Sequence, residues 1–419
     1  MAVIKPFRAV RPAPGLAVEV AEPPYDVMSA EEARDMAAGR ENSFLRVDKA
    51  EIELPGIDPY DDAVYRRARE NFRRMLQERV FIQDPVPMLY IYRLTSPHST
   101  GQTGVAACAS IDEYLSGAIR RHELTRQEKE LDRVKHIKYC GAHTGPIFLA
   151  YRNQPGIDAL VTEWTESHSP YCDFTRENVR HQAWTVDDKS VINALVDNFA
   201  RVPVMYIADG HHRNAAAARA ALEMLENNQV YSHSEEFNNY LAVMFPAEQL
   251  KILEYNRLVK DLNGLSPQEF LEKIAQKFTV TRTNGVPAPA KSGQFCAYMP
   301  GQWFTLEVKP EFIPADPIGA LDVSLLQNLV LGPVLGISDP RADKRIDFSG
   351  GARGAAELAA RVDSGEMAAA FALYPVSMDT LMTIADAGDI MPPKSTWFEP
   401  KLLSGLFIHL LDPPRQEGQ

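Results

Sequence analysis

The chain has 419 residues, of which 45% are hydrophobic and 24% are charged. This composition excludes a mostly disordered chain and leaves room for two or three domains. Lys and Arg number 44 against 56 Asp and Glu, so the net charge is −12 at pH 7. A surface of this sign repels a polyphosphate backbone, and we therefore expect no nucleic-acid partner.

Cysteine usage and the amino terminus indicate the compartment. The four cysteines are scattered and form no C-x-x-C pair: Cys108, Cys140, Cys172 and Cys296. This is typical of reduced thiols in the cytosol. Lys5, Arg8 and Arg11 interrupt the apolar runs of the amino terminus, so we predict no signal peptide and no membrane span. We expect a cytoplasmic protein without a membrane partner, and leave open whether it forms a homo-oligomer.

Strands and helices are predicted to alternate in the first half of the chain. Ser29 and Glu32 predict a capping box that begins a helix over 30–39. Apolar residues at helical spacing predict a second helix over 62–79. Ser110 and Glu113 predict another capping box, with a helix that continues to about residue 122. Apolar runs predict strands over 85–94, 104–110, 147–151, 183–186 and 202–208.

The second half continues the alternation. An alanine-rich helix is predicted over 211–227, and Ser266, Pro267 and Glu269 predict a further helix start. Strands are predicted over 238–245, 295–299, 303–308 and 371–374, and helices over 324–331, 353–362 and 377–386. Residues 284–293 are rich in proline, glycine and alanine, which makes them the best candidate linker. The pattern predicts an α/β or α+β fold of mixed sheets with helices.

The segment from Ala208 to Ala216 is the most informative for chemistry. Gly210 allows a sharp turn from the strand into the helix, whose first amides then form an anion site. His211, His212 and Arg213 add donors and positive charge, and Asp209 can hold a divalent ion or orient a histidine. This set of groups suits phosphate handling. The plainer alternative is that Asp209 only caps the helix and that the histidines lie on the surface.

Three other segments can be compared with the sequence signatures of common enzyme classes. Lys394, Ser395 and Thr396 lack the upstream glycines of a Walker A loop, although Lys394 and Lys401 can clamp a phosphate from a proline-stiffened loop. The H-E-x-x string that begins at His122 ends in arginine, which excludes a zincin because the second histidine is missing. Residues 128–133 form a charge run, which indicates a solvated helix face.

Several segments together resemble a known family. They are Pro23–Val27, His143–Ile147, Ile207–Arg213, Met391–Thr396, Pro400–Lys401 and Ser404–Leu406. On these segments the chain is identified as a member of the DUF1015 family, and its D-G-H-H-R string resembles the ParB/sulfiredoxin-like free serine kinases. The resemblance implies a ParB/sulfiredoxin-like kinase core within residues 1–283, and a C-terminal α/β region over 294–419 that contributes to the site.

The resemblance also implies an activity and its residues. The activity is phosphoryl transfer to the hydroxyl of free L-serine, from pyrophosphate, ATP or ADP, with Mg²⁺ as cofactor. Contacts to the donor phosphate and the metal are implied for residues 209–213, with Asp209 at the metal. A carboxylate of an amino-terminal loop is implied as the base, with Asp26 the first choice and Glu22 the second. Further contacts are implied for Tyr25, His143, Thr144, Thr125, Asp132 and Arg133.

Two alternatives belong to other function classes. One is a nucleotide-binding regulatory or DNA-associated protein, which needs a basic stripe or a helix-turn-helix. The other is a metal-dependent phosphohydrolase that uses His211 and His212. A hydrolase releases phosphate without an acceptor alcohol, which separates it from a kinase.

Overall fold

The structure is a computed structural model that describes residues 2–96, 101–226 and 235–411. The chain separates into two compact units. The first comprises Met1–Leu250 and Pro400–Gln419, and the second comprises Lys251–Glu399. Each unit has its own sheets and helices, so the expected α+β class is confirmed.

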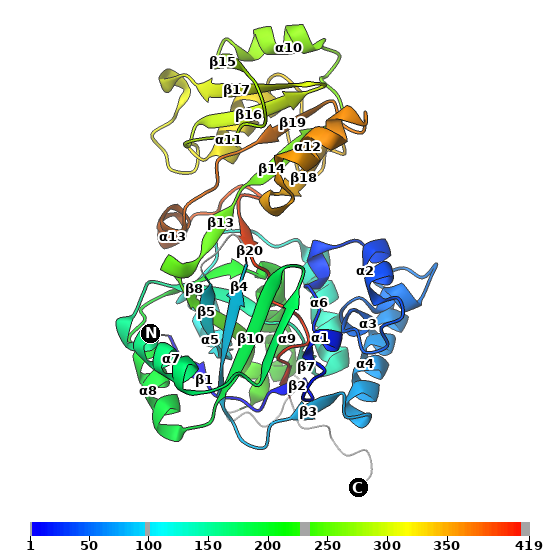
Figure 1. Ribbon diagram of the computed structural model, residues 1–419, viewed down its shortest axis with the longest axis vertical. Coiled ribbons are helices and arrows are strands. Elements are labelled where there is room, and N and C mark those ends of the chain that lie inside the picture. The colour runs from blue at the N-terminus through cyan, green and yellow to red at the C-terminus, as the bar shows by residue number, and fades with distance from the viewer. Residues whose placement is uncertain (1, 97–100, 227–234, 412–419) are drawn as a thin grey trace. The chain divides into compact units, whose positions relative to one another are not determined.

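A large mixed sheet organises the first unit (Figure 1). Its strands follow the order β6-β11-β8-β12-β5-β4-β10-β9, and β1 pairs with β5. β6 runs parallel to β11 and β8 runs parallel to β12, whereas the other neighbours are antiparallel. The strands are β1 (Ile4–Lys5), β4 (Leu89–Thr95), β5 (Gln102–Ser110), β6 (Ile119–Arg120), β8 (Ile147–Tyr151), β9 (Cys172–Arg176), β10 (Val179–Val186), β11 (Met205–Asp209) and β12 (Asn239–Pro246).

The central strands are apolar on both faces, which is why apolar runs in the sequence located them. Strand β8 is buried at every position, and so are all but the first residue of β12. Burial on both faces requires cover on both sides, and near-continuous apolar runs are typical of such strands. The strands predicted over 85–94, 104–110, 147–151, 183–186, 202–208 and 238–245 are confirmed with shifts of a few residues at their ends.

The helices of the first unit begin largely where capping signals predicted. Ser29 and Glu32 form a capping box at the start of α2, and Asp61 caps α4. The alanine-rich helix α9 is confirmed as far as Glu226, while residue 227 lies outside the described residues. The helices are α1 (Ala17–Val20), α2 (Ala30–Ala37), α3 (Leu45–Asp48), α4 (Asp62–Gln77), α5 (Ile111–Leu115), α6 (Gln127–Cys140), α7 (Pro155–Ser167), α8 (Lys189–Phe199) and α9 (His211–Glu226).

The helix predicted from Ser110 to about residue 122 is wrong in its length and its cap. Helix α5 ends at Leu115, and Gly117 then adopts a φ of +80° before strand β6 begins. Ser110 accepts a hydrogen bond from the amide of Asp112, whereas the Glu113 carboxylate accepts one from the amide of Val3. A distant partner therefore takes the glutamate that a capping box would use.

The carboxyl-terminal segment returns to the first unit. Strand β21 (His409–Leu410) pairs with β7 (Ala142–His143), and an isolated bridge joins Glu22 to Ser404. A further small sheet joins β2 (Val10–Pro12) to β3 (Phe81–Gln83). Phe407 is fully buried, with its ring 5.4 Å from that of Tyr90. Residues after 400 thus complete the core of a unit that starts at the amino terminus.

The second unit carries a six-stranded antiparallel sheet in the order β15-β17-β16-β19-β14-β18. Residues 284–293, the expected linker, connect β15 to β16 within this unit. The division of function between residues 1–283 and 294–419 stays a prediction. The elements are β13 (Lys251–Leu253), β14 (Tyr255–Val259), α10 (Pro267–Ile274), β15 (Phe278–Thr283), β16 (Gln294–Met299), β17 (Gln302–Val308), α11 (Asp322–Leu326), β18 (Ile346–Gly350), α12 (Gly354–Asp363), β19 (Ala369–Ala372), α13 (Met378–Asp386) and β20 (Trp397–Glu399), which pairs with β13.

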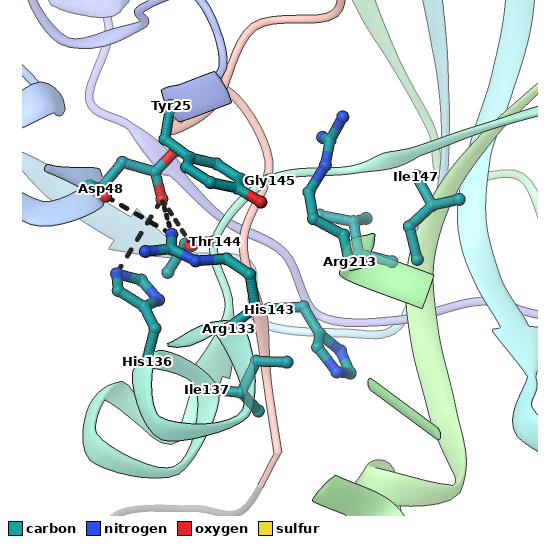
Figure 2. A pocket seen from close by; sticks show the side chains of 11 residues that line it. Tyr25, Asp48, Arg133, His136, Ile137, His143, Thr144, Gly145, Ile147 and Arg213 are labelled. Carbon is teal, nitrogen blue, oxygen red and sulfur yellow. Dashed lines mark hydrogen bonds and ion pairs between the residues drawn. The ribbon is translucent and has the colours of Figure 1, made fainter. Parts of the chain in front are cut away.

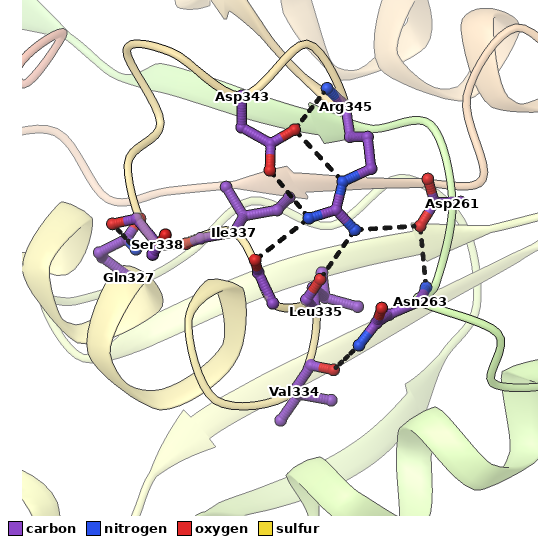
Figure 3. A network of polar contacts seen from close by, with 10 residues as sticks. Asp261, Asn263, Gln327, Val334, Leu335, Ile337, Ser338, Asp343 and Arg345 are labelled. Atoms are coloured by element: carbon purple, nitrogen blue, oxygen red, sulfur yellow. Dashed lines mark hydrogen bonds and ion pairs between the residues drawn. The ribbon is translucent and has the colours of Figure 1, made fainter.

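An arginine fixes the loops of the second unit that surround the end of β14. The Arg345 guanidinium donates to the Leu335 carbonyl at 3.0 Å and to the Asp343 carboxylate at 2.8 Å, and Asp261 lies 3.5 Å away (Figure 3). Helix α10 begins with the predicted capping box of Ser266 and Glu269. The helix predicted over 324–331 continues α11 as a π-helical turn over Gln327–Leu331. Within the described residues, no helix is both long enough and apolar enough to cross a bilayer.

Candidate functional site

The sharpest turn of the candidate site lies between β11 and α9. Gly210 has a φ of +90°, and a Cβ at this position would lie 3.1 Å from Nε of Arg213. Strand β11 carries a β-bulge, because Ile207 pairs with Leu149 while Asp209 pairs with Phe148. Bulges re-aim side chains at the end of a strand. The bulge and the glycine together set the directions of Asp209 and of the first turn of α9.

Arg213 is the central cation of this turn. Its guanidinium donates to the Pro146 carbonyl at 2.5 Å and to the Asp209 carboxylate at 3.2 Å. Its side chain is only 11% exposed, and its Nε has no hydrogen-bond partner among the described residues. Burial alone would lower the pKa of Arg213, but the carboxylates of Asp26 and Asp209 outweigh burial and raise it. The guanidinium therefore keeps its charge and one unused donor.

Asp209 joins this arginine to a lysine from the carboxyl-terminal segment. Lys401 Nζ lies 3.6 Å from one oxygen of the Asp209 carboxylate, and Arg213 contacts the other oxygen. Asp26, in the short turn that follows the two prolines, is exposed, and its charge acts on both Arg213 and Tyr25. The structure thus brings together four predicted site residues from three distant parts of the sequence: Asp26, Asp209, Arg213 and Lys401.

A small cavity of about 30 Å³ lies beside Arg213 (Figure 2). It is lined by Tyr25, Asp48, Arg133, His136, Ile137, His143, Thr144, Gly145, Ile147, Arg213 and Leu241. The predicted residues Tyr25, His143 and Thr144 all face it. The cavity is too small to enclose a substrate, but charged and polar groups converge on it, as they do in small-molecule sites.

Asp48 is the buried carboxylate of this cavity, and sequence reasoning missed it. It accepts a hydrogen bond from Thr144 Oγ1 at 3.1 Å, and Arg133 Nη1 lies 3.8 Å away (Figure 2). His136 Nε2 is 3.9 Å from the same carboxylate and 3.1 Å from the Val47 carbonyl. The partners of Asp48 lie 85 to 96 residues away in the sequence, so no local motif marks it.

Arg133 links the cavity to a second hollow of about 200 Å³. Its Nε donates to Asp132 at 2.9 Å, and its guanidinium lies 4.0 Å from the centre of the Tyr25 ring. Tyr65 donates to the other oxygen of Asp132 at 2.9 Å. Tyr25, Asp48, Arg133 and His136 line both hollows. The interpretation of 128–133 as a solvated face is wrong for Asp132 and Arg133, which are buried because they lie on the inner side of α6.

Glu22 lies in an ion-pair cluster of its own. Its carboxylate contacts Arg40 at 2.7 Å and Arg176 at 2.6 Å, and accepts a hydrogen bond from Ser43 at 2.7 Å. The residue is fully buried. Two arginines and a hydroxyl occupy the carboxylate, and Glu22 does not line the cavity beside Arg213.

The histidines of the predicted site have separate surroundings. His143 Nδ1 lies 3.3 Å from Nδ1 of His409, and burial holds the pKa of His143 well below its usual range. His212 Nε2 accepts a hydrogen bond from the amide of Arg126 at 3.0 Å. His211 is buried, and burial together with the charge of His122 lowers its pKa. His143 and His211 are therefore neutral at pH 7.

The second lysine motif belongs to the other unit. Lys394, Ser395 and Thr396 lie in the second unit, whereas Lys401 lies in the first. Ser395 is buried and donates to the Pro392 carbonyl at 2.6 Å. The Lys394 ammonium lies 5.2 Å from the centre of the Tyr255 ring. Lys401 is the member of the proposed phosphate clamp that lies in the same unit as Asp209, with its Nζ 3.6 Å from the carboxylate.

The sequence and the structure were compared with known proteins. A family model described as "Protein of unknown function (DUF1015)" matches residues 4–324. No curated protein matches the chain. The solved structures that resemble it include a conserved hypothetical protein from Pyrococcus furiosus, with 15% identity over 73% of this chain and 95% of that chain and a TM-score of 0.36.

Two other solved structures are similar at the same level. A free serine kinase in complex with AMP has 14% identity over 70% of this chain and 86% of its own, with a TM-score of 0.36. SbnI with a C-terminal truncation, from Staphylococcus aureus, has 10% identity over 75% of this chain and 90% of its own, with a TM-score of 0.39. At these TM-scores the chains do not superpose closely on this one.

Proposed function

The chain belongs to the DUF1015 family, and we propose that it is a small-molecule phosphotransferase that converts free L-serine to O-phosphoserine. The observation that carries this proposal is the turn at Gly210, where Arg213, Lys401 and Asp209 surround the amino end of α9. The choice of serine as the acceptor depends on the resemblance of the D-G-H-H-R segment to free serine kinases.

The phosphate end of the proposed site combines two kinds of donor. The first amides of a helix have no partner within the helix and attract anions. Arg213 adds a buried guanidinium with an unused Nε–H, and Lys401 adds an ammonium that is 13% exposed. Groups fixed in this way before the reaction stabilise the charge that develops on a transferring phosphoryl group.

Asp26 is the base of the proposed mechanism. It is exposed and lies close enough to Arg213 to act on its charge. The serine hydroxyl oxygen bonds to phosphorus while its proton passes to the Asp26 carboxylate. The bond from phosphorus to the bridging oxygen breaks, and its electron pair leaves with ADP, AMP or inorganic phosphate, depending on whether the donor is ATP, ADP or pyrophosphate. Glu22 is less suitable because two arginines already occupy its carboxylate.

The charged groups that line the cavity beside Arg213 and the adjoining hollow suit the amino acid itself. A zwitterion needs an anion for its ammonium group and a cation for its carboxylate. Asp48 and Arg133 both line the cavity, and Thr144 holds the Asp48 carboxylate in place. The Tyr25 ring lies under the Arg133 guanidinium at 4.0 Å, a cation–π contact that helps to hold this cation in place. We therefore place the acceptor between Asp48, Arg133 and Arg213.

The residues present fit a magnesium ion bound together with the donor. Mg²⁺ is commonly held by one or two carboxylates plus phosphate oxygens and water. The Asp209 carboxylate is 27% exposed, so a metal that arrives with phosphates can reach it. When bound, the ion would neutralise negative charge on the phosphate oxygens. Asp209 would hold it.

Phosphorus NMR tests the reaction and the donor together. The protein is incubated with Mg²⁺ and L-serine, and ATP, ADP and pyrophosphate are supplied in separate reactions. We expect an O-phosphoserine signal with at least one donor. Phosphate release that is equal with and without serine would instead identify the phosphohydrolase. Retention on a DNA column at moderate salt with no turnover would favour the DNA-associated alternative.

Arg213→Ala tests the proposed phosphate site. Loss of a fixed transition-state donor commonly costs about 100- to 1,000-fold in kcat, and we expect a loss of at least that size. The matched control is Arg219→Ala on the same helix, because Arg219 is 39% exposed and pairs only with surface glutamates. We expect near-normal turnover for the control. If both variants fold and turn over equally well, Arg213 has no part in the reaction.

A further inference from the structure

A second cluster of ligand atoms lies on the other side of the first turn of α9. His122, Glu123 and His211 each offer one ligand atom, and these atoms all lie within 4.8 Å of one another. The His122 and His211 rings are 4.4 Å apart and perpendicular, at 87°. His211 Nδ1 lies 4.0 Å from a Glu123 carboxylate oxygen. The fold therefore supplies, from residue 211, the second histidine that the H-E-x-x string lacks.

The burial of His211 is not explained by hydrogen bonds within the protein. The residue is only 7% exposed, and its Nε2 has no hydrogen-bond partner among the described residues. Burying a polar nitrogen without a partner is unfavourable, because the nitrogen loses its hydrogen bonds to water. A bond to a metal ion would offset that cost. The lack of a hydrogen-bond partner for His211 Nε2 among the described residues is a second observation, independent of the clustering, that points to a ligand.

We propose that His122, Glu123 and His211 bind a divalent transition-metal ion of the zinc type. Two imidazoles and one carboxylate form a ligand set that suits Zn²⁺ and its neighbours, whereas Mg²⁺ prefers oxygen ligands alone. This site is separate from the magnesium proposed at Asp209 and does not depend on the kinase activity. Three protein ligands leave a coordination position open for water or for an oxygen of a bound molecule.

The geometry needs only small side-chain movements. Ligand bonds to zinc are about 2.0–2.2 Å long, so ligand atoms in a tetrahedral site lie roughly 3.3–3.5 Å apart by the same geometry. The ligand atoms of the three residues, which now lie within 4.8 Å of one another, reach this spacing if their side chains rotate slightly inward. Glu123 is 30% exposed, which gives the ion a path from solvent.

Surrounding groups hold the cluster in place. His122 has a hydrogen bond with the backbone of Ile207, and such a bond commonly orients a metal-binding imidazole. The amide of Arg126 donates to His212 Nε2 at 3.0 Å, which ties the loop that carries His122 to α9. His212 is thus a positioning residue for this site.

Metal titration tests the proposal without any measurement of turnover. The full-length protein is stripped with a chelator and titrated with Zn²⁺ by calorimetry and with Co²⁺ by visible absorption. We expect one ion per chain, a Co²⁺ spectrum with the intense bands of low coordination number and nitrogen ligands, and much weaker binding of Mg²⁺. Binding of Mg²⁺ as tight as that of Zn²⁺ would overturn the assignment.

Conservative variants locate the ion. Glu123→Gln and His122→Gln keep side-chain volume, and we expect each to weaken Zn²⁺ binding at least tenfold and to change the Co²⁺ spectrum. The control is Glu128→Gln, which alters an exposed acid near the start of α6 and should leave both unchanged. Circular dichroism establishes that each variant is folded. Stoichiometric binding that survives both ligand substitutions, or no binding by the wild-type protein, would overturn the proposal.

Discussion

At the scale of single residues, the candidate site is distinguished by buried charge. Asp48 and Arg133 are both buried, although their partners come from α3, α6 and the turn after β7. The sequence located the Asp209–Arg213 string because glycine and charge are adjacent there. It could not locate Asp48, because a carboxylate at the end of a four-residue helix has no local signature and its role depends on contacts about 90 residues away.

Asp48→Asn tests how much this buried carboxylate matters to the folded state. The amide keeps the shape and can still accept from Thr144, but it removes one of the two negative charges beside Arg133. Breaking a buried ion pair commonly costs about 3–5 kcal/mol. Because Asp132 still pairs with Arg133, we expect a loss of about 3 kcal/mol in the free energy of unfolding, at the lower end of that range, measured by urea titration.

Asp62→Asn is the matched control for that substitution. Asp62 also pairs with a cation, Lys135 at 2.8 Å, but both side chains are about half exposed. Exposed pairs contribute little because water screens them, so the urea midpoint of this variant should stay close to that of the wild type. An equal effect of the two substitutions would show that burial does not amplify the charge of Asp48.

At the scale of elements, the strand–turn–helix unit of β11 and α9 was predictable, but its packing was not. Apolar and alanine-rich runs gave both elements within a few residues. The β-bulge at the end of β11 has no signature in the sequence, because it is defined by the register against β8. Alanine content predicted helix propensity, whereas the structure shows that alanines 215–218, 220 and 221 are buried. Small side chains allow α9 to lie close to its neighbours.

Ala220→Leu tests this close packing. Ala220 is 1% exposed and belongs to the main core cluster together with Val134 and Ile137 of α6. Leucine is a good helix former, so propensity alone predicts almost no change. Overpacking a filled core costs about 1–3 kcal/mol, and we expect a loss of that size in urea unfolding. Leu222→Ala, at a 43% exposed position of the same helix, should change stability far less. Equal effects would contradict close packing of α9.

At the scale of the whole molecule, the sequence predicted the α+β class and most elements, but not how distant segments combine. Residues after 400 complete the first unit through β21 and Phe407, and they bring Lys401 to Asp209. Periodicity and capping are local signals, so they predict elements and leave their partners open. Resemblance to a family indicated that the segments belong together, and the fold gives the physical contacts.

Buried neutral histidines are a property of the first unit as a whole. His136, His143, His181 and His409 are buried on four different elements. Burial lowers the pKa of each, and brings that of His181 to about 3, with the charge of Arg176 adding to the effect. In the unfolded chain these groups have pKa values near 6.5. Below that pH the unfolded state therefore binds protons that the folded state does not.

We accordingly predict that the free energy of unfolding is at its full value above pH 6.5 and falls as the pH decreases toward the folded pKa values. Each proton taken up on unfolding contributes a slope of about 1.4 kcal/mol per pH unit. Urea titrations at steps between pH 7 and pH 5, with a chelator present, measure the total slope.

His181→Phe places a ring between Tyr92 and Phe174, where the imidazole is stacked, and it removes one titrating group. In this variant the free energy of unfolding should change less steeply with pH, by the contribution of about one proton, even if the stability at pH 7 differs. A slope identical to that of the wild type would mean that His181 binds no additional proton on unfolding.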